Sequence, residues 1–457
     1  MQIKEFVAKV KSKEIDILDY TSKVLQELEK TNNEYHYLSN ISKELALYLA
    51  KKVSKDPSGK LAGVPISVKD CICIKGLETS ACSTILKGYK PVFTATVVNK
   101  LIKEGAIIVG KTIQDEFGFG SFCTNIGNGF STPLNPFDKE RCCGGSSGGS
   151  AGITKKSKNL HISIAESTGG SIACPASFCG IVGFTPTYGL LSRNGLIDYG
   201  SSLDKIGPMA KNINDCQTIF EIIKGQDIKD PTSKFKILDT NKPKTFAIIK
   251  EAFEVDSGIK EIILKKLSNL GFETKEISLP YVKKYAIPAY YIISMAEAST
   301  NLAKFCGLRY GLQMDLKEKY NEYFSKVRSQ GFSKEAKRRI LIGTFARMAG
   351  YRDAYYLKAL KVRQKIINEY KKAFKKNEIL ISPSMPILPP KFTEIEKLAP
   401  IDTYQMDQLT VGPNLAGLPH ISINAGFKEE LPIGMMLIGD HFNDNSIFTA
   451  LGEYGEN

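Results

Sequence analysis

Three short segments of the chain contain residues that could do chemistry together. Lys69 ends the apolar run 65–69 (PISVK), and burying an amine is costly unless it is neutralised or well hydrogen-bonded. Residues 144–150 (GGSSGGS) consist only of Gly and Ser. Residues 167–172 (STGGSI) place two glycines before Ser171, and such a backbone can point successive N–H groups at one spot. A strand-end lysine or a flexible loop would explain each segment alone, but their co-occurrence favours a catalytic site.

Together these segments resemble the signature of the amidase signature family, whose members use a Ser–Ser–Lys triad. The resemblance implies that Ser171 is the nucleophile, that Ser146 bridges through a cis peptide bond, and that Lys69 is the general base. It also implies that an oxyanion hole is formed by the backbone N–H groups of Thr168, Gly169, Gly170 and Ser171. Ser–Lys pairs are an accepted variant of the Ser–His–Asp mechanism, so the chemistry needs no histidine.

The lysine must lose a proton if it is to act as a base near neutral pH. The pKa of a free lysine amine is about 10.4, and we expect desolvation of Lys69 in the core to lower it. The reaction would then transfer an acyl group from an amide to Ser171, release ammonia and hydrolyse the acyl-enzyme.

Two other motif matches indicate different enzyme classes, and their surroundings argue against both. Residues 105–112 (GAIIVGKT) match the phosphate-binding P-loop, but the four residues between the glycines predict a buried strand. Residues 144–148 (GGSSG) match the nucleophile elbow of α/β-hydrolases, but the preceding residues 138–143 (DKERCC) do not form an apolar strand. A hydrolase triad would also need a histidine such as His420, which we interpret as structural.

The resemblance extends over nearly the whole chain and narrows to one branch of the family, the glutamine-hydrolysing subunits of tRNA-dependent amidotransferases. The segments that carry this narrower match include 188–193 (YGLLSR), 201–208 (SSLDKIGP), 296–302 (AEASTNL) and 414–419 (NLAGLP). A stand-alone amidase would be expected to diverge through residues 280–420.

This branch implies that glutamine is the ammonia donor, and a free amino acid needs partners for both of its charged groups. Arginine grips a carboxylate in a bidentate manner, and an aspartate suits an ammonium group. The matching positions are Arg339 for the α-carboxylate, with Arg338 as the alternative, and Asp407 for the α-ammonium. Tyr291 is expected to line the same pocket. Without the resemblance, the two adjacent arginines are explained equally well as a basic helix face.

The chain departs from the family pattern at two positions near the nucleophile. Relatives usually have Asp and Arg where this chain has Ser167 and Ala173. Our hypothesis is that these charges form a structural ion pair in relatives and were lost together, because losing one would leave an unpaired buried ion. Catalysis is expected to be unaffected.

The resemblance also implies partners. Ammonia would pass through an internal channel to a B subunit that activates misacylated tRNA with ATP and Mg²⁺, and a C subunit would complete a heterotrimer. The chain itself is expected to need no metal or nucleotide and to contact tRNA mostly through the B subunit. The acceptor, Glu-tRNA(Gln) or Asp-tRNA(Asn), stays open. The alternatives are an independent amidase acting on a small carboxamide and a non-catalytic scaffold of a tRNA-processing complex.

The residue patterns predict the elements that must position these groups. Residues 1–56 show helical spacing of apolar residues, which predicts a helical N-terminal arm. Beyond them, the apolar runs 61–69 and 106–109 flank a helical segment, which is typical of parallel strands joined by a crossover helix. We therefore predict an α/β/α sandwich with a large mixed, mainly parallel central sheet, in a single catalytic domain over 57–457.

Composition sets broad limits on the protein. The 457 residues are 42% hydrophobic and carry 62 Lys+Arg against 48 Asp+Glu, a net charge of +14. This indicates a globular protein with a large core, and the charge alone does not indicate a nucleic-acid partner. The ten cysteines form no CxxC pair, so a zinc site is not indicated and reduced thiols are expected. No apolar run approaches the roughly 18 residues of a membrane span, so we expect a cytoplasmic protein.

Overall fold

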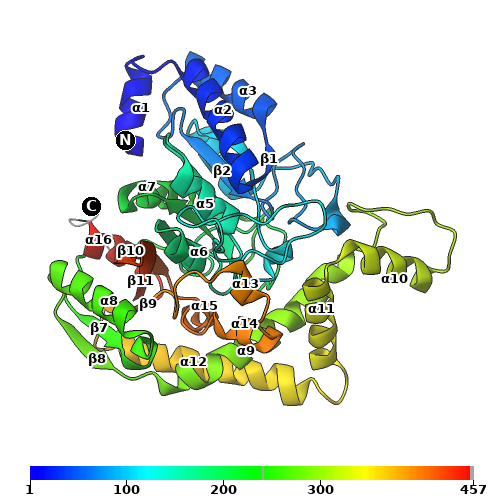
Figure 1. Ribbon diagram of the computed structural model, residues 1–457, viewed down its shortest axis with the longest axis vertical. Helices are drawn as coiled ribbons and strands as arrows, with labels where there is room; N and C mark the ends of the chain where they lie inside the picture. Colours follow the sequence, from blue (N-terminus) through cyan, green and yellow to red (C-terminus); the bar gives the residue numbers. More distant parts are fainter. Residues whose placement is uncertain (239–240, 453–457) are drawn as a thin grey trace.

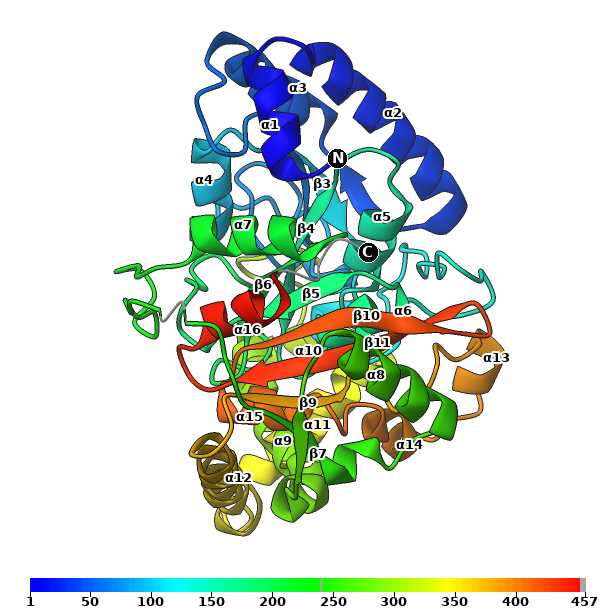
Figure 2. The same cartoon turned by 90° about the vertical axis from the view of Figure 1, so that its left-hand side faces the viewer.

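The computed structural model, which describes residues 1–238 and 241–452, is built around an 11-stranded sheet. Its strand order is β1-β3-β2-β4-β6-β5-β10-β11-β9-β7-β8, and Figure 2 shows the strands following one another from β3 to β7. The strands are β1 Leu38–Ile41, β2 Pro65–Lys69, β3 Ile107–Thr112, β4 Ile162–Ser167, β5 Val182–Thr185, β6 Lys205–Ala210, β7 Phe246–Ile249, β8 Thr274–Ile277, β9 Ile379–Pro383, β10 His420–Lys428 and β11 Leu431–Gly439. Strand β3 contains most of the run 106–109. The strand predicted there is therefore confirmed, and residues 105–112 do not form a P-loop.

The directions of the strands correct one part of the predicted fold. The sheet is mixed, but among the described residues six strand pairings are antiparallel and four are parallel, so "mainly parallel" was wrong. The parallel pairs are confined to β3-β2-β4 and β9-β7-β8. Between them lie β6, which runs against β4 and β5, and the β10–β11 hairpin.

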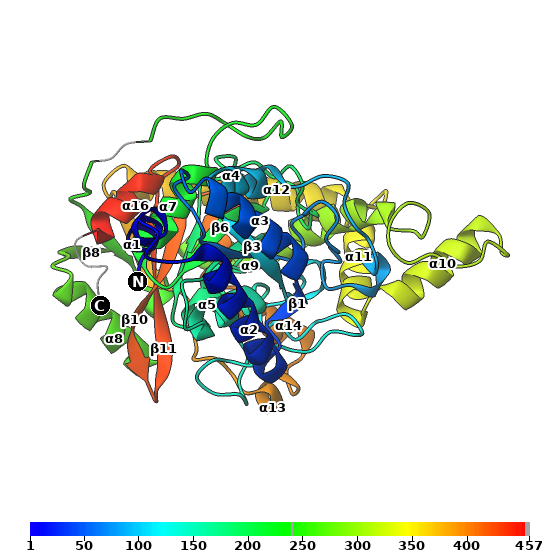
Figure 3. The same ribbon diagram turned by 90° about the horizontal axis from the view of Figure 1, so that it is seen from above.

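Helices cover the sheet at both ends and on both faces (Figure 1). In the described chain they are α1 Ile3–Lys11, α2 Ile17–Tyr35, α3 Lys43–Lys55, α4 Thr96–Lys103, α5 Gly148–Lys156, α6 Ala173–Phe178, α7 Ile213–Ile223, α8 Ser257–Asn269, α9 Pro280–Asn301, α10 Tyr320–Gly331, α11 Lys334–Arg347, α12 Lys358–Phe374, α13 Phe392–Ile395, α14 Pro400–Gln405, α15 Val411–Ala416 and α16 Asp444–Leu451. None of these is long and apolar enough to cross a lipid bilayer. Helices α11, α12 and α15 all pack against α9, whereas α10 extends away from the sheet (Figures 1 and 3).

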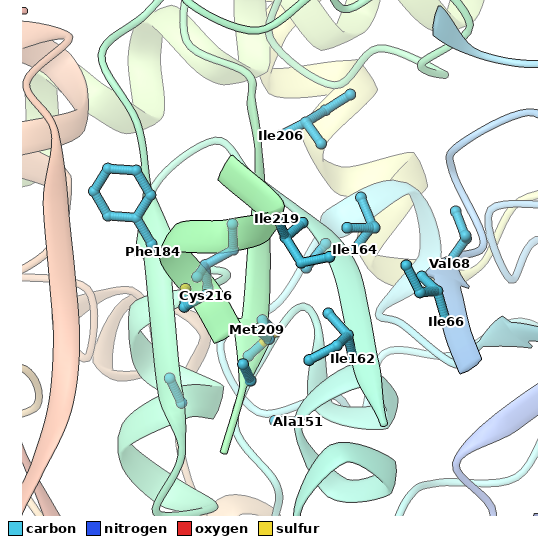
Figure 4. Close-up of a cluster of buried hydrophobic side chains, with 14 of the residues drawn as sticks. Ile66, Val68, Ala151, Ile162, Ile164, Phe184, Ile206, Met209, Cys216 and Ile219 are labelled. Carbon is cyan, nitrogen blue, oxygen red and sulfur yellow. The ribbon is translucent and has the colours of Figure 1, made fainter. Parts of the chain in front are cut away.

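The core has two main layers because successive strand residues point to opposite faces of the sheet. Along β9, Ile379 and Ile381 join one hydrophobic cluster, and Leu380 joins the other. Figure 4 shows part of the first cluster, where Ile66, Val68, Ile162 and Ile164 of β2 and β4 lie near Cys216 and Ile219 of α7. These apolar side chains fix the two strands whose carboxyl ends carry the candidate site.

The N-terminal segment 1–56 is mainly helical, as predicted, but it also contributes β1, which pairs antiparallel with β3 at the edge of the sheet. Its helices share the main hydrophobic cluster through residues such as Phe6, Val24 and Leu28. The division into an arm at 1–56 and a catalytic domain at 57–457 stays a prediction.

Candidate active site

Lys69 is the last residue of β2, where the parallel strands β2 and β4 both approach their carboxyl ends. The side chain is fully buried. Its Nζ donates to Ser146 Oγ at 2.7 Å, to the backbone carbonyl of Glu166 at 2.9 Å and to Glu166 Oε2 at 2.9 Å. All three donors of an ammonium group are therefore satisfied, two of them by Glu166.

The pKa of Lys69 corrects our expectation of an uncharged amine. Burial does act to lower this pKa, as expected, but the charge of Glu166 and the hydrogen bond that Lys69 donates to it outweigh this effect. The pKa of Lys69 therefore lies above its ordinary value. The prediction failed because a lysine buried with a carboxylate partner keeps its proton, and the partner lies 97 residues away in the chain.

Ser146 is fully buried in the Gly/Ser-rich loop that leads into α5. The Gly145–Ser146 peptide bond is cis, as the resemblance implied. Backbone hydrogen bonds fix this loop, because Gly145 donates to the carbonyl of Ser121 at 2.8 Å and Asp115 donates to the carbonyl of Ser146 at 3.1 Å. The Ser146 hydroxyl is thus presented directly to Lys69.

Ser171 lies in the loop between β4 and α6. It is 7% exposed, whereas Lys69 and Ser146 are completely enclosed. Within residues 1–238 and 241–452, no hydrogen bond joins Ser171 to Ser146. The structure therefore links Lys69 and Ser146 directly, and the role of Ser171 as nucleophile stays a prediction.

The two glycines before Ser171 allow a close approach of the backbone to two other elements. A β-carbon on Gly169 would lie 2.7 Å from the hydroxyl of Tyr290 in α9, and one on Gly170 would lie 2.4 Å from Oγ1 of Thr410. Real β-carbons do not tolerate such contacts, so a side chain at either position would push the loop away. The glycines keep this backbone next to the predicted substrate pocket, and its role as oxyanion hole stays a prediction.

The two departures from the family pattern occupy neutral surroundings. The Ser167 hydroxyl donates to the carbonyl of Gly169 at 3.2 Å and accepts from Asn414 Nδ2 at 3.2 Å. Ala173 is buried in the second hydrophobic cluster with Leu203 and Met436. Neither position leaves an unpaired charge, which is compatible with our hypothesis of a lost ion pair without testing it.

Arg339 is held in a buried aromatic cage. Its Nε donates to Glu335 Oε1 at 2.8 Å and its Nη1 to the hydroxyl of Tyr199 at 2.6 Å. The guanidinium carbon lies 5.2–5.7 Å from the ring centroids of Phe119, Tyr199, Tyr291 and Tyr404. The side chain of Arg338 is 30% exposed and that of Arg339 is 3% exposed, so Arg339 is the arginine that lies inside this cage.

Asp407 and Tyr291 lie beside Arg339, and their role in binding substrate stays a prediction. The Tyr291 hydroxyl donates to Asp407 Oδ2 at 2.6 Å, and its ring lies beside Arg339. Burial raises the pKa of Asp407, although the hydrogen bond from Tyr291 and the charge of Arg339 oppose this. Thr410, which packs against Gly170, also donates to the backbone carbonyl of Asp407 at 3.2 Å. The predicted oxyanion backbone and the predicted glutamine-binding residues are therefore in contact.

Sequence reasoning missed two carboxyl groups near Lys69, those of Glu166 and Asp204, and it considered Thr168 only for its backbone N–H group. Glu166 binds Lys69, and its Oε1 accepts from Thr168 Oγ1 at 2.8 Å. Thr168 Oγ1 also lies 2.7 Å from Asp204 Oδ1. The signal for Glu166 was present, since it is a carboxylate inside the otherwise uncharged strand 162–167, the same type of anomaly that drew attention to Lys69.

The sequence and the structure are both similar to known proteins. A family model described as "Amidase" matches residues 19–448. The chain is 43% identical to the A subunit of glutamyl-tRNA(Gln) amidotransferase from Archaeoglobus fulgidus, over 98% of this chain and 97% of the relative. It is 41% identical to the protein of the same name from Thermoanaerobacter pseudethanolicus, over 98% and 95% of the two chains.

A solved structure shows that this similarity extends to the fold. The crystal structure of the A subunit of glutamyl-tRNA(Gln) amidotransferase from Thermotoga maritima aligns with a TM-score of 0.80 at 33% identity, covering 100% of this chain and 95% of that one. The family model, the relatives and this structure span nearly the full chain. The protein therefore belongs to the amidase family.

Proposed function

We propose that the protein is the glutamine-hydrolysing subunit of a tRNA-dependent amidotransferase. The observation that carries this proposal is the proximity of buried Arg339 and Asp407, which are connected through Tyr291 and are close to the loop that bears Ser171. One fixed cation and one carboxylate suit the two charged ends of an α-amino acid. The full-length relatives, which are named as A subunits of glutamyl-tRNA(Gln) amidotransferases, support the same activity.

The proposed reaction begins with glutamine anchored at both charged groups. Arg339 binds its α-carboxylate and Asp407 its α-ammonium, which leaves the side-chain amide to reach Ser171. The Ser171 oxygen attacks the amide carbon, and the N–H groups of residues 168–171 stabilise the oxyanion. Ammonia leaves, and water then hydrolyses the acyl-enzyme to glutamate. Overall, glutamine and water give glutamate and ammonia.

The proposal places the acceptor chemistry in partner subunits. A B subunit would use ATP and Mg²⁺ to activate Glu-tRNA(Gln) or Asp-tRNA(Asn) and consume the ammonia, and a C subunit would complete the heterotrimer. The chain would bind no cofactor itself and would contact tRNA mainly through the B subunit, in the cytoplasm. The proposal includes both aminoacyl-tRNAs as acceptors.

The test is glutamine hydrolysis by the assembled complex, measured with and without charged tRNA. We expect Ser171→Ala to lower turnover by about 10³-fold or more, because it removes the nucleophile. A matched control is Ser446→Ala, since Ser446 is equally buried but lies in α16. A glutamine-like electrophile should label Ser171 in the wild-type complex.

Three results would contradict the proposal. Hydrolysis that is independent of the partner subunits and prefers a simple carboxamide over glutamine would indicate an independent amidase. An assembled complex with neither glutamine hydrolysis nor labelling of Ser171 would indicate a scaffold. Full activity of the Ser171→Ala complex would exclude the proposed nucleophile.

A further inference from the structure

A buried row of hydrogen-bonded side chains, two of them acidic, starts at Lys69 and has no part in the predicted triad. Lys69 Nζ contacts Glu166 Oε2, Glu166 Oε1 accepts from Thr168 Oγ1, and Thr168 Oγ1 contacts Asp204 Oδ1. All four residues are at least 97% buried. Because charges and polar groups are costly in such a place, the positions of their protons are restricted by their partners.

The contacts of the Thr168 hydroxyl show that either Glu166 or Asp204 carries a proton. It has a single proton, yet it lies within hydrogen-bond distance of two carboxyl oxygens, so one of these must carry a proton and donate. Glu166 already accepts from Lys69. Burial and the charge of Glu166 raise the pKa of Asp204 well above its usual value. The Asp204 oxygens also accept from the backbone N–H groups of Tyr199 and Gly200. Because Glu166 is the carboxylate that pairs with the Lys69 ammonium, the proton is assigned to Asp204, which donates to Thr168, and Thr168 donates to Glu166.

The contacts of Lys69 point in the same direction. The carbonyl and Oε2 of Glu166 both lie 2.9 Å from Nζ and accept from it, whereas the Ser146 hydroxyl at 2.7 Å can either accept or donate. The buried carboxylate at 2.9 Å favours the ammonium form of Lys69. It is also the nearest place for a proton that leaves Lys69.

We propose that Glu166 is the proton acceptor at the end of the relay, so that Lys69 is charged both before and after each transfer. Lys69 first gives a proton to Glu166 Oε2, and the resulting amine turns its lone pair toward Ser146 Oγ. As Ser171 attacks, its proton moves to Ser146 Oγ and the Ser146 proton moves to Lys69 Nζ. A proton then moves along the relay in the reverse direction to the departing nitrogen, which leaves as ammonia. Glu166 acts through Lys69, so it is a positioning and proton-holding residue. This inference rests on the proposed function.

The neighbouring titratable groups do not replace Glu166 in this role. Those that face the Lys69–Glu166 pair are Cys71, Asp115, Cys123 and Asp204. Burial raises the pKa of both thiols, so they stay protonated. Burial raises the pKa of Asp115 to about 6, but its oxygens accept from the backbone of Cys123 and Asn125 rather than from Lys69.

The test is the pH dependence of kcat/KM for glutamine in the assembled complex, for wild type and Glu166→Gln. In the wild type, Lys69 is charged at rest and passes its proton to Glu166, so activity should persist below the alkaline range. In Glu166→Gln, Lys69 itself must lose a proton first, so the acid limb should move to higher pH. Below that limb, activity should fall about tenfold per pH unit. Glu221→Gln, an exposed change in α7, is the control and should match the wild type.

An uncharged-lysine mechanism predicts the opposite shift. Wild-type activity would then require loss of the Lys69 proton and would rise only in the alkaline range, and Glu166→Gln would move the limb to lower pH. Either result would overturn the proposal, as would superimposable wild-type and Glu166→Gln profiles. If Glu166→Gln fails to fold, the wild-type limb alone decides. A wild-type complex that does not hydrolyse glutamine refutes the proposed function instead.

Discussion

Replacing Arg339 by lysine tests the glutamine pocket most directly, because charge is kept while the planar fork of donors is lost. Arg339 uses Nε for Glu335 and Nη1 for Tyr199, which leaves three of its five N–H donors for a substrate carboxylate. A lysine has three donors in total. If the lysine keeps the contacts with Glu335 and Tyr199, only one N–H donor remains for the substrate. The carboxylate is then bound by one hydrogen bond instead of two.

The expected loss follows from that count. A hydrogen bond to a charged group contributes about 1.5–3 kcal/mol, so kcat/KM for glutamine should fall by about 10–100-fold in Arg339→Lys. Most of the loss should appear in KM, because the carboxylate is bound before and during the reaction. Thermal unfolding of the variant should change little, since the buried charge opposite Glu335 is retained.

Arg338→Lys is the matched control in the assay of glutamine hydrolysis. Arg338 is partly exposed and pairs with Glu335, so its replacement should cost less than about 1 kcal/mol, or fivefold. A second control uses 4-aminobutanamide, which keeps the amide and the amine but lacks the α-carboxylate. For this substrate the penalty of Arg339→Lys should largely disappear.

Two outcomes would refute the assignment. Arg338→Lys with a larger loss than Arg339→Lys would show that the wrong arginine has been placed in the pocket. An equal loss on glutamine and on 4-aminobutanamide would show that Arg339 supports the structure without binding the carboxylate.

Three further changes test other parts of the structure. Tyr291→Phe removes the hydroxyl that donates to Asp407, so KM for glutamine should rise about tenfold, and an unchanged KM in steady-state kinetics would exclude this contact. Gly170→Ala places a β-carbon 2.4 Å from Thr410, so hydrolysis should be largely lost and the melting temperature lowered, and wild-type values for both would contradict the packing. Burial lowers the pKa of Lys205 to about 7. Between about pH 7 and 10 the unfolded chain binds more protons there than the folded one, so this lysine costs stability at low pH and the cost fades as pH rises. Lys205→Met should therefore raise the free energy of unfolding by up to about 5 kcal/mol at pH 6.5 and by much less at pH 10, as measured by denaturant titration, and a gain independent of pH would refute the assignment.

Much of the candidate site was visible in the sequence because its residues are conspicuous locally. A charged residue at the end of an apolar strand marked Lys69, and runs of glycine and serine marked the loops of Ser146 and Ser171. The resemblance then supplied Arg339, Asp407 and Tyr291, which the structure places side by side. It also implied the cis bond before Ser146.

Strand direction could not be obtained in the same way. An apolar run predicts a strand but contains no information about whether its neighbours run parallel or antiparallel. The pairing of β4 with β6 joins residues about 40 positions apart, and the β10–β11 hairpin enters the middle of the sheet beside β5 and β9. The final arrangement depends on which hydrophobic faces pack together. For that reason the prediction overestimated the share of parallel strand pairings.

The candidate catalytic side chains were identified from the sequence alone, since amine, hydroxyl and glycine backbone are fixed by residue type, and their roles stay predictions. The protonation state of Lys69 was decided only by the tertiary structure. Burial by itself would favour a neutral amine, but folding places the carboxylate of Glu166 within 2.9 Å of the same nitrogen. In this buried site, the attraction between opposite charges at that distance outweighs the cost of burial, and the lysine keeps its proton.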